Sequence, residues 1–195
     1  MNLSEYRAEA ILRDGTPVVI RAIRPDDRGA LREGFLHLSD RTVYHRFLRA
    51  KRDLTDAELR YFTELDFRDH IGLAVELPAA HGGHLIAVGR AVRIAPLASA
   101  PGGTPTGPTG APPVGGLPQR DSAEVAFVVQ DEYQGRGVAT LLLDHLARIA
   151  RELGYRAFEA EVLPENRQML EVFAHSGLTP RERLRDGLVH VEMDL

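Results

Sequence analysis

The sequence of 195 residues has no cysteine and a single lysine, Lys51. Without cysteine there can be no disulfide, no thiolate metal ligand and no cysteine nucleophile. No apolar run approaches the ~20 residues of a membrane-spanning helix, and the N-terminus, MNLSEYRAEAILRDG, is too charged for a signal peptide. These absences predict a cytoplasmic protein with no membrane partner and no thiolate metal site.

The charge balance argues against a further class of partner. The formal net charge is -4 and 44% of the residues are hydrophobic. A mildly acidic chain of this kind does not fit a protein whose main partner is nucleic acid. Its length fits one domain, and its apolar content is enough for a full core. We therefore expect residues 1–195 to form a single domain that does not bind nucleic acid.

Strands and helices are predicted to alternate along the chain. One hairpin is predicted where Asp14-Gly15 separates two β-rich runs, and another around Asp186-Gly187 closes the chain. A helix over 55–65 opens with a capping box from Thr55 to Glu58. The other predicted elements are helices at 26–39, at 137–153 and from Asn166 to about Gly177, and strands at 70–77, 84–94, 123–129 and 156–163. This order predicts the α/β class with a mixed sheet.

Residues 96–120, PLASAPGGTPTGPTGAPPVGGLPQR, differ in composition from the rest of the chain. They hold most of its prolines, no acidic residue and one terminal arginine. Such a stretch cannot bury enough apolar area to offset the entropy lost on ordering it. The alternative, a linker between two domains, leaves too few strands after it for a second sheet. We expect a flexible insertion between two core strands.

The stretch QDEYQGRGVATLLLDHL (130–146) follows an apolar strand and leads into a helix. Its two glycines expose backbone amides where the helix begins, and the first amides of a helix attract anions. A P-loop would need Gly-Lys-Ser/Thr, which the one lysine cannot supply. A dinucleotide fingerprint needs a glycine where Thr140 stands. A glycine-rich turn that binds nothing is the remaining alternative.

The hexapeptide from Gln134 to Ala139 fits the Q/R-x-x-G-x-G/A signature that binds pyrophosphate in the GNAT acyltransferase superfamily. AEVAFVV, DEYQGRGVATLLLDHLARIARELGY and PENRQMLEVFAHSGL resemble the core of that superfamily in order and spacing. Upstream, LRDGTPVVIRAIRPDD, LSDRTVYHRF and LDFRDHIGLAVE resemble the GNAT domain of bacterial protein-lysine acetyltransferases of the Pat type. The resemblance implies a mostly antiparallel central sheet flanked by helices, with acetyl-CoA as co-substrate and no metal.

The resemblance also implies where acetyl-CoA binds. Amides of the glycine turn would converge on its pyrophosphate, with Arg136 adding charge. Amides near Val128 and Val129 would suit the oxygen of a tetrahedral intermediate. Asn166 resembles a family asparagine that contacts the cofactor, although a plain helix N-cap is the alternative. The residues expected at the cofactor are Val128, Val129, Gln134, Gly135, Arg136, Gly137, Val138, Ala139, Thr140, Asn166 and Phe173.

Acetyl transfer to an amine requires a group that takes the amine's proton, because a lysine ammonium has a pKa of about 10.4. The resemblance places a catalytic glutamate at Glu124, whose charge interrupts an apolar strand and calls for a cleft or a partner. The alternative is a glutamate that only pairs with an arginine. Glu159 and Glu161 share a strand face and are weaker candidates, with Asp66 and His70 in reserve.

The last core helix departs from the family pattern. Many members carry a tyrosine there as the acid that protonates the leaving thiolate, and this chain has Phe173. Phenylalanine cannot donate a proton, so the thiolate leaves unaided or takes a proton from water, His175 or Ser176. The basic run from His45 to Arg52 is interpreted as a solvated face or a contact with an acidic acceptor surface.

The sequence therefore predicts an N-acetyltransferase that moves acetyl from acetyl-CoA directly to a primary amine, with a protein lysine as the leading acceptor. A small-amine acetyltransferase of the aminoglycoside or polyamine type is one alternative. A silent module that binds acyl-CoA without turnover is another, because Phe173 replaces the usual acid. The acceptor and the oligomeric state, a homodimer included, are left open.

Overall fold

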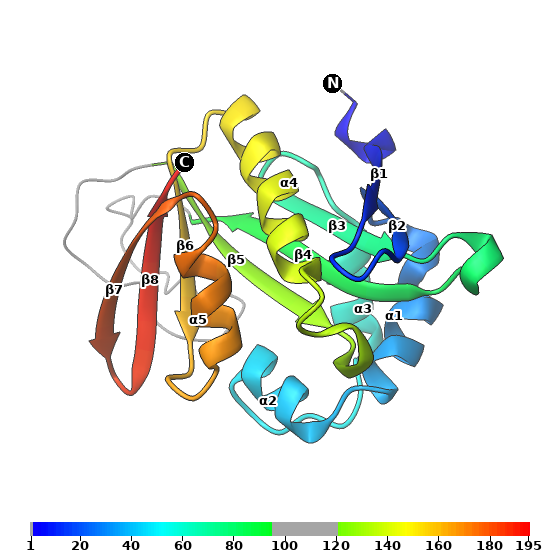
Figure 1. Ribbon diagram of the computed structural model, residues 1–195, viewed down its shortest axis with the longest axis horizontal. Coiled ribbons are helices and arrows are strands. Elements are labelled where there is room, and N and C mark those ends of the chain that lie inside the picture. The colour runs from blue at the N-terminus through cyan, green and yellow to red at the C-terminus, as the bar shows by residue number, and fades with distance from the viewer. Residues whose placement is uncertain (1, 95–120) are drawn as a thin grey trace.

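The computed structural model describes residues 2–94 and 121–195, and the predicted insertion at 96–120 lies outside the described residues. Eight strands form one sheet in the order β1-β2-β3-β4-β5-β6-β8-β7 (Figure 1). All neighbouring strands pair antiparallel except β5 and β6. The predicted α/β class with a mostly antiparallel sheet is confirmed. The strands are β1 (Arg7–Ile11), β2 (Pro17–Ala22), β3 (His70–Glu76), β4 (Leu85–Arg93), β5 (Ser122–Val129), β6 (Ala157–Val162), β7 (Thr179–Arg185) and β8 (Leu188–Asp194).

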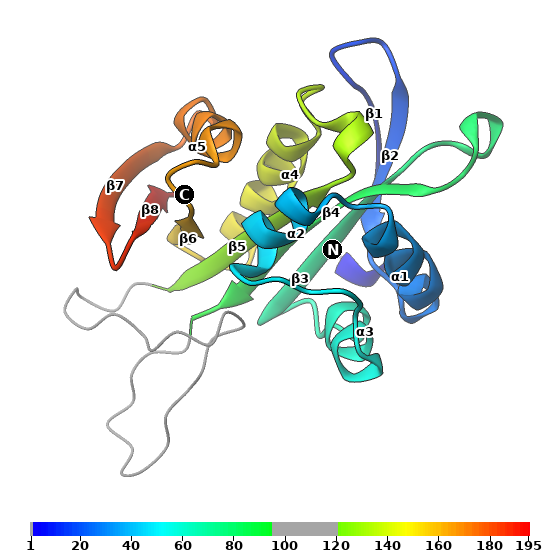
Figure 2. The ribbon, with the colours of Figure 1, turned by 90° about the horizontal axis from the view of Figure 1, so that it is seen from below.

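The helices form two layers around the sheet (Figures 1 and 2). The helices are α1 (Arg28–Leu36), α2 (Asp40–Phe47), α3 (Asp56–Thr63), α4 (Val138–Glu152) and α5 (Arg167–Ala174). Helix α4 packs its apolar stripe on the strands and helps to form the main core, whereas α1, α2 and α3 share a smaller cluster around Phe35 and Val43. Alternate residues of β5 face these two layers. Val125, Phe127 and Val129 belong to the main core.

Both predicted hairpins are present, and their turns explain the sequence at their tips. Gly15, Asp186 and Gly187 have positive φ values of 87°, 50° and 81°, a region that glycine and aspartate adopt at low cost. The first hairpin joins β1 to β2 and the second joins β7 to β8. The first hairpin brings its tip next to the start of α4 (Arg13 N to Arg136 O, 3.3 Å).

Helix α2 is a correction to the sequence prediction, which placed one helix over 26–39 and none over 40–47. The first helix ends at Leu36, and Ser39 caps a second one by accepting a hydrogen bond from the Thr42 amide at 3.2 Å. Only Val43 of α2 is buried, so its hydrophobic pattern is weak. The polar pattern is more informative, with Asp40 in the first turn and His45 and Arg46 in the last, as the helix dipole favours.

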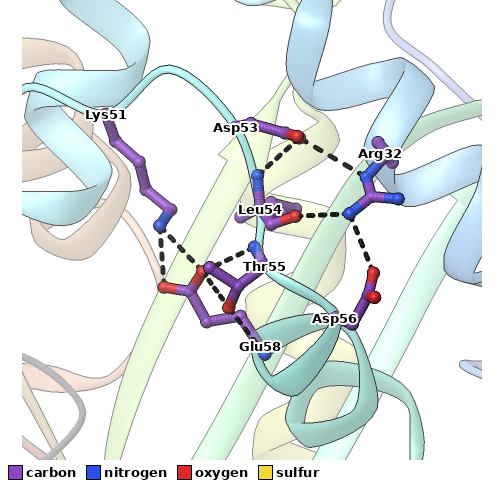
Figure 3. A network of polar contacts seen from close by, with 7 residues as sticks. All are labelled: Arg32, Lys51, Asp53, Leu54, Thr55, Asp56 and Glu58. Atoms are coloured by element: carbon purple, nitrogen blue, oxygen red, sulfur yellow. Dashed lines mark hydrogen bonds and ion pairs between the residues drawn. The ribbon is translucent and has the colours of Figure 1, made fainter.

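The connection from α2 to α3 is fixed by the polar contacts in Figure 3. The predicted capping box is confirmed, since Thr55 Oγ1 accepts from the Glu58 amide and Glu58 Oε2 accepts from the Thr55 amide. Lys51 Nζ donates to both carboxylate oxygens of Glu58 at 2.8 Å. Arg32 donates to Leu54 O at 2.9 Å and so joins this connection to α1. These contacts join the connection between α2 and α3 to α1 and to the first turn of α3.

Candidate active site

The site lies where β5 and β6 separate. The two parallel strands pair only from Ser122 to Glu124, against Ala157 to Glu159. Beyond this point a cavity of about 560 Å³ opens between β5, β6, α2, α5 and the start of α4. Every sequence-predicted site residue except Arg136 lines this cavity. Those that do are Glu124, Val128, Val129, Gln134, Gly135, Gly137, Val138, Ala139, Thr140, Asn166 and Phe173.

The glycine turn closes one end of the cavity. Gly135 and Gly137 have φ values of 74° and 89°, which a residue with a Cβ adopts only with strain. Gly137 precedes α4. The first amides of this helix have no intrahelical partner, and the N-cap position supplies no side chain that accepts from them. This end of the cavity therefore offers a cluster of N–H donors at a positive helix terminus, which suits a phosphate group.

The sequence suggested that Arg136 adds charge at the phosphate site, but its side chain does not line the cavity. Its Nη1 donates to Asp14 Oδ2 at 2.9 Å, and its guanidinium lies 5.0 Å from the centroid of the Tyr133 ring. Arg13, from the first hairpin, lines the cavity instead. Nothing in the sequence marks Arg13 as a site residue, because it stands more than 120 positions before the turn.

The backbone of β5 corrects one detail of the predicted oxyanion contact. Gln130 N donates to Ile86 O at 2.9 Å and Ile94 N donates to Ser122 O at 2.9 Å. Hydrogen-bonded pairs alternate along an antiparallel ladder, so the amide of Val128 is bonded to Val88 on β4. The amides of Phe127 and Val129 point the other way, toward the gap left by β6. Val129, and not Val128, therefore has the available donor.

Glu124 sits half-buried on the cavity wall and makes no hydrogen bond or ion pair with any residue that the structure describes. Burial raises the pKa of its carboxyl group, Arg46 opposes that effect, and the nearby charge of Glu161 adds to it. A carboxylate with a raised pKa and no fixed partner is suited to accept a proton. The alternative, in which Glu124 only pairs with an arginine, is not supported by any ion pair of Glu124 among the described residues.

Two arginines lie close enough to Glu124 for their charge to oppose the rise in its pKa. Arg90 of β4 is 8% exposed, and its guanidinium lies 4.5 Å from the Phe62 ring and 5.1 Å from the Tyr61 ring. Its Nε and Nη1 have no hydrogen-bond partner among the described residues. Arg46 of α2 lines the cavity. This corrects the interpretation of the basic run as a solvated face, because at least Arg46 turns inward.

The other carboxylates of β6 differ in their surroundings. Glu161 lines the cavity, and its Oε2 is buried without a hydrogen-bond partner in the described part of the chain. Glu159 lies 3.6 Å from His190 Nε2 across the sheet. Asp66 accepts three backbone N–H groups in the turn before β3, which lowers the pKa of its carboxyl group despite its partial burial. Asp66 and His70 do not line the cavity.

Helix α5 supplies the opposite wall. Asn166 caps it by accepting from the Met169 amide at 3.3 Å and also lines the cavity. Phe173 is 1% exposed and packs 6.2 Å from the Phe127 ring. Ser176 donates its hydroxyl hydrogen to Phe173 O at 2.7 Å and does not line the cavity. His175 is exposed at the cavity wall, with Nδ1 donating to Glu171 O at 2.9 Å.

Helix α2 is attached to the turn that follows β5. Asp131 accepts from Ser39 Oγ at 2.7 Å, from Ser39 N at 3.0 Å and from Thr42 Oγ1 at 2.8 Å. Gln134 Nε2 donates to Thr42 Oγ1 at 3.0 Å and to Val129 O at 3.1 Å. The first residue of the glycine signature thus joins β5, α2 and the turn.

The fold, with diverging strands, a glycine turn and an unpaired glutamate in one cavity, is that of an N-acetyltransferase. The chain belongs to the acetyltransferase (GNAT) family, whose sequence profile matches residues 38–178. It is 31% identical over 185 residues to acetyltransferase Pat of Mycolicibacterium smegmatis, covering 94% of this chain and 47% of that protein. The chain thus spans about half the length of this curated relative.

Several solved structures resemble this fold, among them the following two. The GNAT domain of S. lividans PAT is 40% identical, with a TM-score of 0.78 and 97% of both chains covered. A cAMP-binding acyltransferase from Mycobacterium smegmatis is 27% identical, with a TM-score of 0.57, and the match covers 97% of this chain and 47% of that one. None of the helices in residues 2–94 and 121–195 is both long enough and apolar enough to cross a membrane.

Proposed function

We propose that this chain transfers the acetyl group of acetyl-CoA directly to a primary amine, and that the amine is the side chain of a protein lysine. The observation that carries the proposal is the position of Glu124. It lies half-buried and without a partner in the same cavity as the glycine turn. The similarity to acetyltransferase Pat supports a protein acceptor.

The chemistry follows from the two ends of the cavity. The amides of the turn, from Gly135 to Ala139, bind the pyrophosphate of acetyl-CoA, and the thioester then lies along β5 near the free amide of Val129. Glu124 takes a proton from the acceptor ammonium, directly or through water. The amine nitrogen attacks the thioester carbon and gives up its second proton to water, the carbon–sulfur bond breaks, and coenzyme A leaves as the thiolate while the amide forms.

The surroundings of Phe173 bear on how the thiolate is protonated. The Ser176 hydroxyl already donates to the carbonyl of Phe173, so it is not available to protonate the thiolate. Water and His175 remain as proton sources. His175 is exposed and lines the cavity, but Nδ1 is engaged with Glu171 O, so it can donate from Nε2 only as an imidazolium. Water is therefore the simplest source of the proton, and Phe173 is compatible with turnover.

The experiment that tests the proposal is incubation with radiolabelled acetyl-CoA. The protein is mixed with a bacterial lysate in one arm and with a panel of polyamines and aminoglycosides in another. Label on protein lysines supports the proposal. Label on small amines alone would show that the acceptor is a small amine and not a protein lysine. Binding of acetyl-CoA without transfer to any acceptor would favour the silent module. The absence of any binding would overturn the proposed use of acetyl-CoA.

A further inference from the structure

We propose that Arg13, at the tip of the β1–β2 hairpin, binds the pyrophosphate of acetyl-CoA; this rests on the proposed function. Arg13 follows β1 and precedes the tight turn at Gly15. Its backbone amide donates to Arg136 O at 3.3 Å. The hairpin tip is therefore attached to the glycine turn, although the two segments are far apart in the sequence.

The side chain of Arg13 lies across the glycine turn. A Cβ atom placed on Gly137 would lie 3.2 Å from Arg13 Nε and 3.3 Å from its Cγ. Arg13 also lines the cavity. Its guanidinium makes no hydrogen bond or ion pair with any residue in the described ranges. A cation is thus held against the amides of the turn without a protein anion to balance it.

The neighbouring arginine is in the opposite situation. Arg136 belongs to the glycine signature, but Asp14 neutralises it at 2.9 Å. Asp14 is itself fixed in the hairpin turn, where it accepts from the Thr16 amide at 3.0 Å. The hairpin therefore brings one carboxylate, which pairs with the arginine of the signature, and one arginine, which stays unpaired. The free positive charge at this turn belongs to Arg13.

The chemistry of the ligand matches this arrangement. A pyrophosphate carries two adjacent anionic groups, and backbone amides alone bind it as neutral donors. A guanidinium adds charge-assisted hydrogen bonds in a planar fork that fits two phosphate oxygens. Because Arg13 is next to Gly137, where the amides converge, we assign it to the pyrophosphate and not to the 3′-phosphate of coenzyme A.

The test measures the dissociation constants of three ligands by calorimetry: coenzyme A, dephospho-coenzyme A and pantetheine. The variants are Arg13→Gln, Arg13→Lys and, as a control for net charge, Arg60→Gln on the exposed surface of α3. Arg13→Gln is expected to weaken both nucleotide-containing ligands by about tenfold or more, the usual size for a hydrogen bond to a charged group. Arg13→Lys should recover part of this loss, and Arg60→Gln should change nothing.

The other arms separate the competing outcomes. The loss in Arg13→Gln should shrink as salt is added, and pantetheine, which lacks the pyrophosphate, should bind both forms alike. A loss seen with coenzyme A but not with dephospho-coenzyme A would move Arg13 to the 3′-phosphate and overturn the assignment. Equal affinity of wild type and Arg13→Gln would also overturn it. If the wild type binds neither nucleotide, the proposed function itself fails, together with this assignment.

Discussion

Thr42 and Gln134 stand 92 positions apart, yet Gln134 Nε2 donates a hydrogen bond to Thr42 Oγ1 at 3.0 Å. The same threonine hydroxyl donates to Asp131 at 2.8 Å. Because α2 buries only Val43, these polar contacts are a large part of what attaches it to the sheet. Helix α2 in turn carries Arg46 into the cavity. The attachment of a short helix thus contributes to the electrostatics around Glu124, since Arg46 opposes the effect of burial on its pKa.

Replacing Thr42 by valine should therefore loosen α2. The change keeps the side-chain shape but removes the hydroxyl's bonds with Asp131, Gln134 and Ser39, and we expect the free energy of unfolding to fall by about 1 kcal/mol or more. Urea denaturation measures this, and the same change at exposed Thr179 of β7 is the control, expected within about 0.5 kcal/mol of wild type. A Thr42→Val protein with an unchanged denaturation midpoint would show that α2 is held by other contacts.

The sequence predicted the elements that have strong local patterns. The helix over 137–153, the capping box at Thr55 and the turns at Asp14-Gly15 and Asp186-Gly187 each carry their own local signal, and each is confirmed. The sequence could not indicate α2 in the same way, since the carboxylate that anchors it, Asp131, is distant in the chain.

The candidate site was predictable in part for the same reason. Glu124 and the glycine turn are neighbours in sequence and lie in one cavity. Arg13, Arg46 and Arg90 were not predicted, because each comes from a separate segment. Only the folded protein brings Arg13 to the glycine turn and the other two near Glu124. The pairing of Arg136 with Asp14, which leaves Arg13 to line the cavity, could not be predicted either. It depends on where the first hairpin lies relative to α4.

Glu124→Gln should separate binding from chemistry. The carboxylate is not among the phosphate-binding groups, so the affinity for acetyl-CoA should stay the same while turnover falls by ~10²–10⁴-fold, the usual effect of losing a general base. The loss should shrink as pH rises, because more of the amine is then neutral. Calorimetry and initial rates measure the two effects, with Glu152→Gln at the end of α4 as a neutral control. Full activity of Glu124→Gln at pH 7 would move the base to Glu161.

The same substitution should change stability in a pH-dependent way. Burial raises the pKa of Glu124 in the folded protein, so the ionised group destabilises the fold at neutral pH. As pH falls below the unfolded pKa of about 4.3, both states are protonated and the penalty disappears. Glu124→Gln should therefore melt higher than wild type at pH 7, and the difference should vanish near pH 4. A gain that persists at low pH would mean that shape, and not charge, is responsible.

Arg90 should act on Glu124 through its charge alone. Its positive charge lowers the pKa of the glutamate, so Arg90→Met should raise that pKa and shift the acidic limb of the rate profile to higher pH. Methionine keeps much of the apolar contact with Phe62, and Arg90→Lys should return the limb toward its original position. The readout is the pH dependence of kcat/KM. A uniform loss at every pH, with no displacement of the limb, would show that Arg90 serves only to support the fold.

Lys51, the one lysine of the chain, should not be a target of the enzyme itself. Its side chain is 10% exposed, and Nζ is held by both oxygens of Glu58 (Figure 3), outside the residues that line the cavity. An amine that donates to a carboxylate in this way cannot approach Glu124 unless the connection between α2 and α3 opens. Incubation of the protein alone with acetyl-CoA, followed by peptide mass spectrometry, should find Lys51 unmodified. Acetic anhydride should label Lys51 more readily in a Glu58→Gln variant, in which the amine is released, than in wild type. Enzymatic acetylation of Lys51 in the protein alone would show that this connection opens in solution and that the contacts of α2 are weaker than the structure indicates.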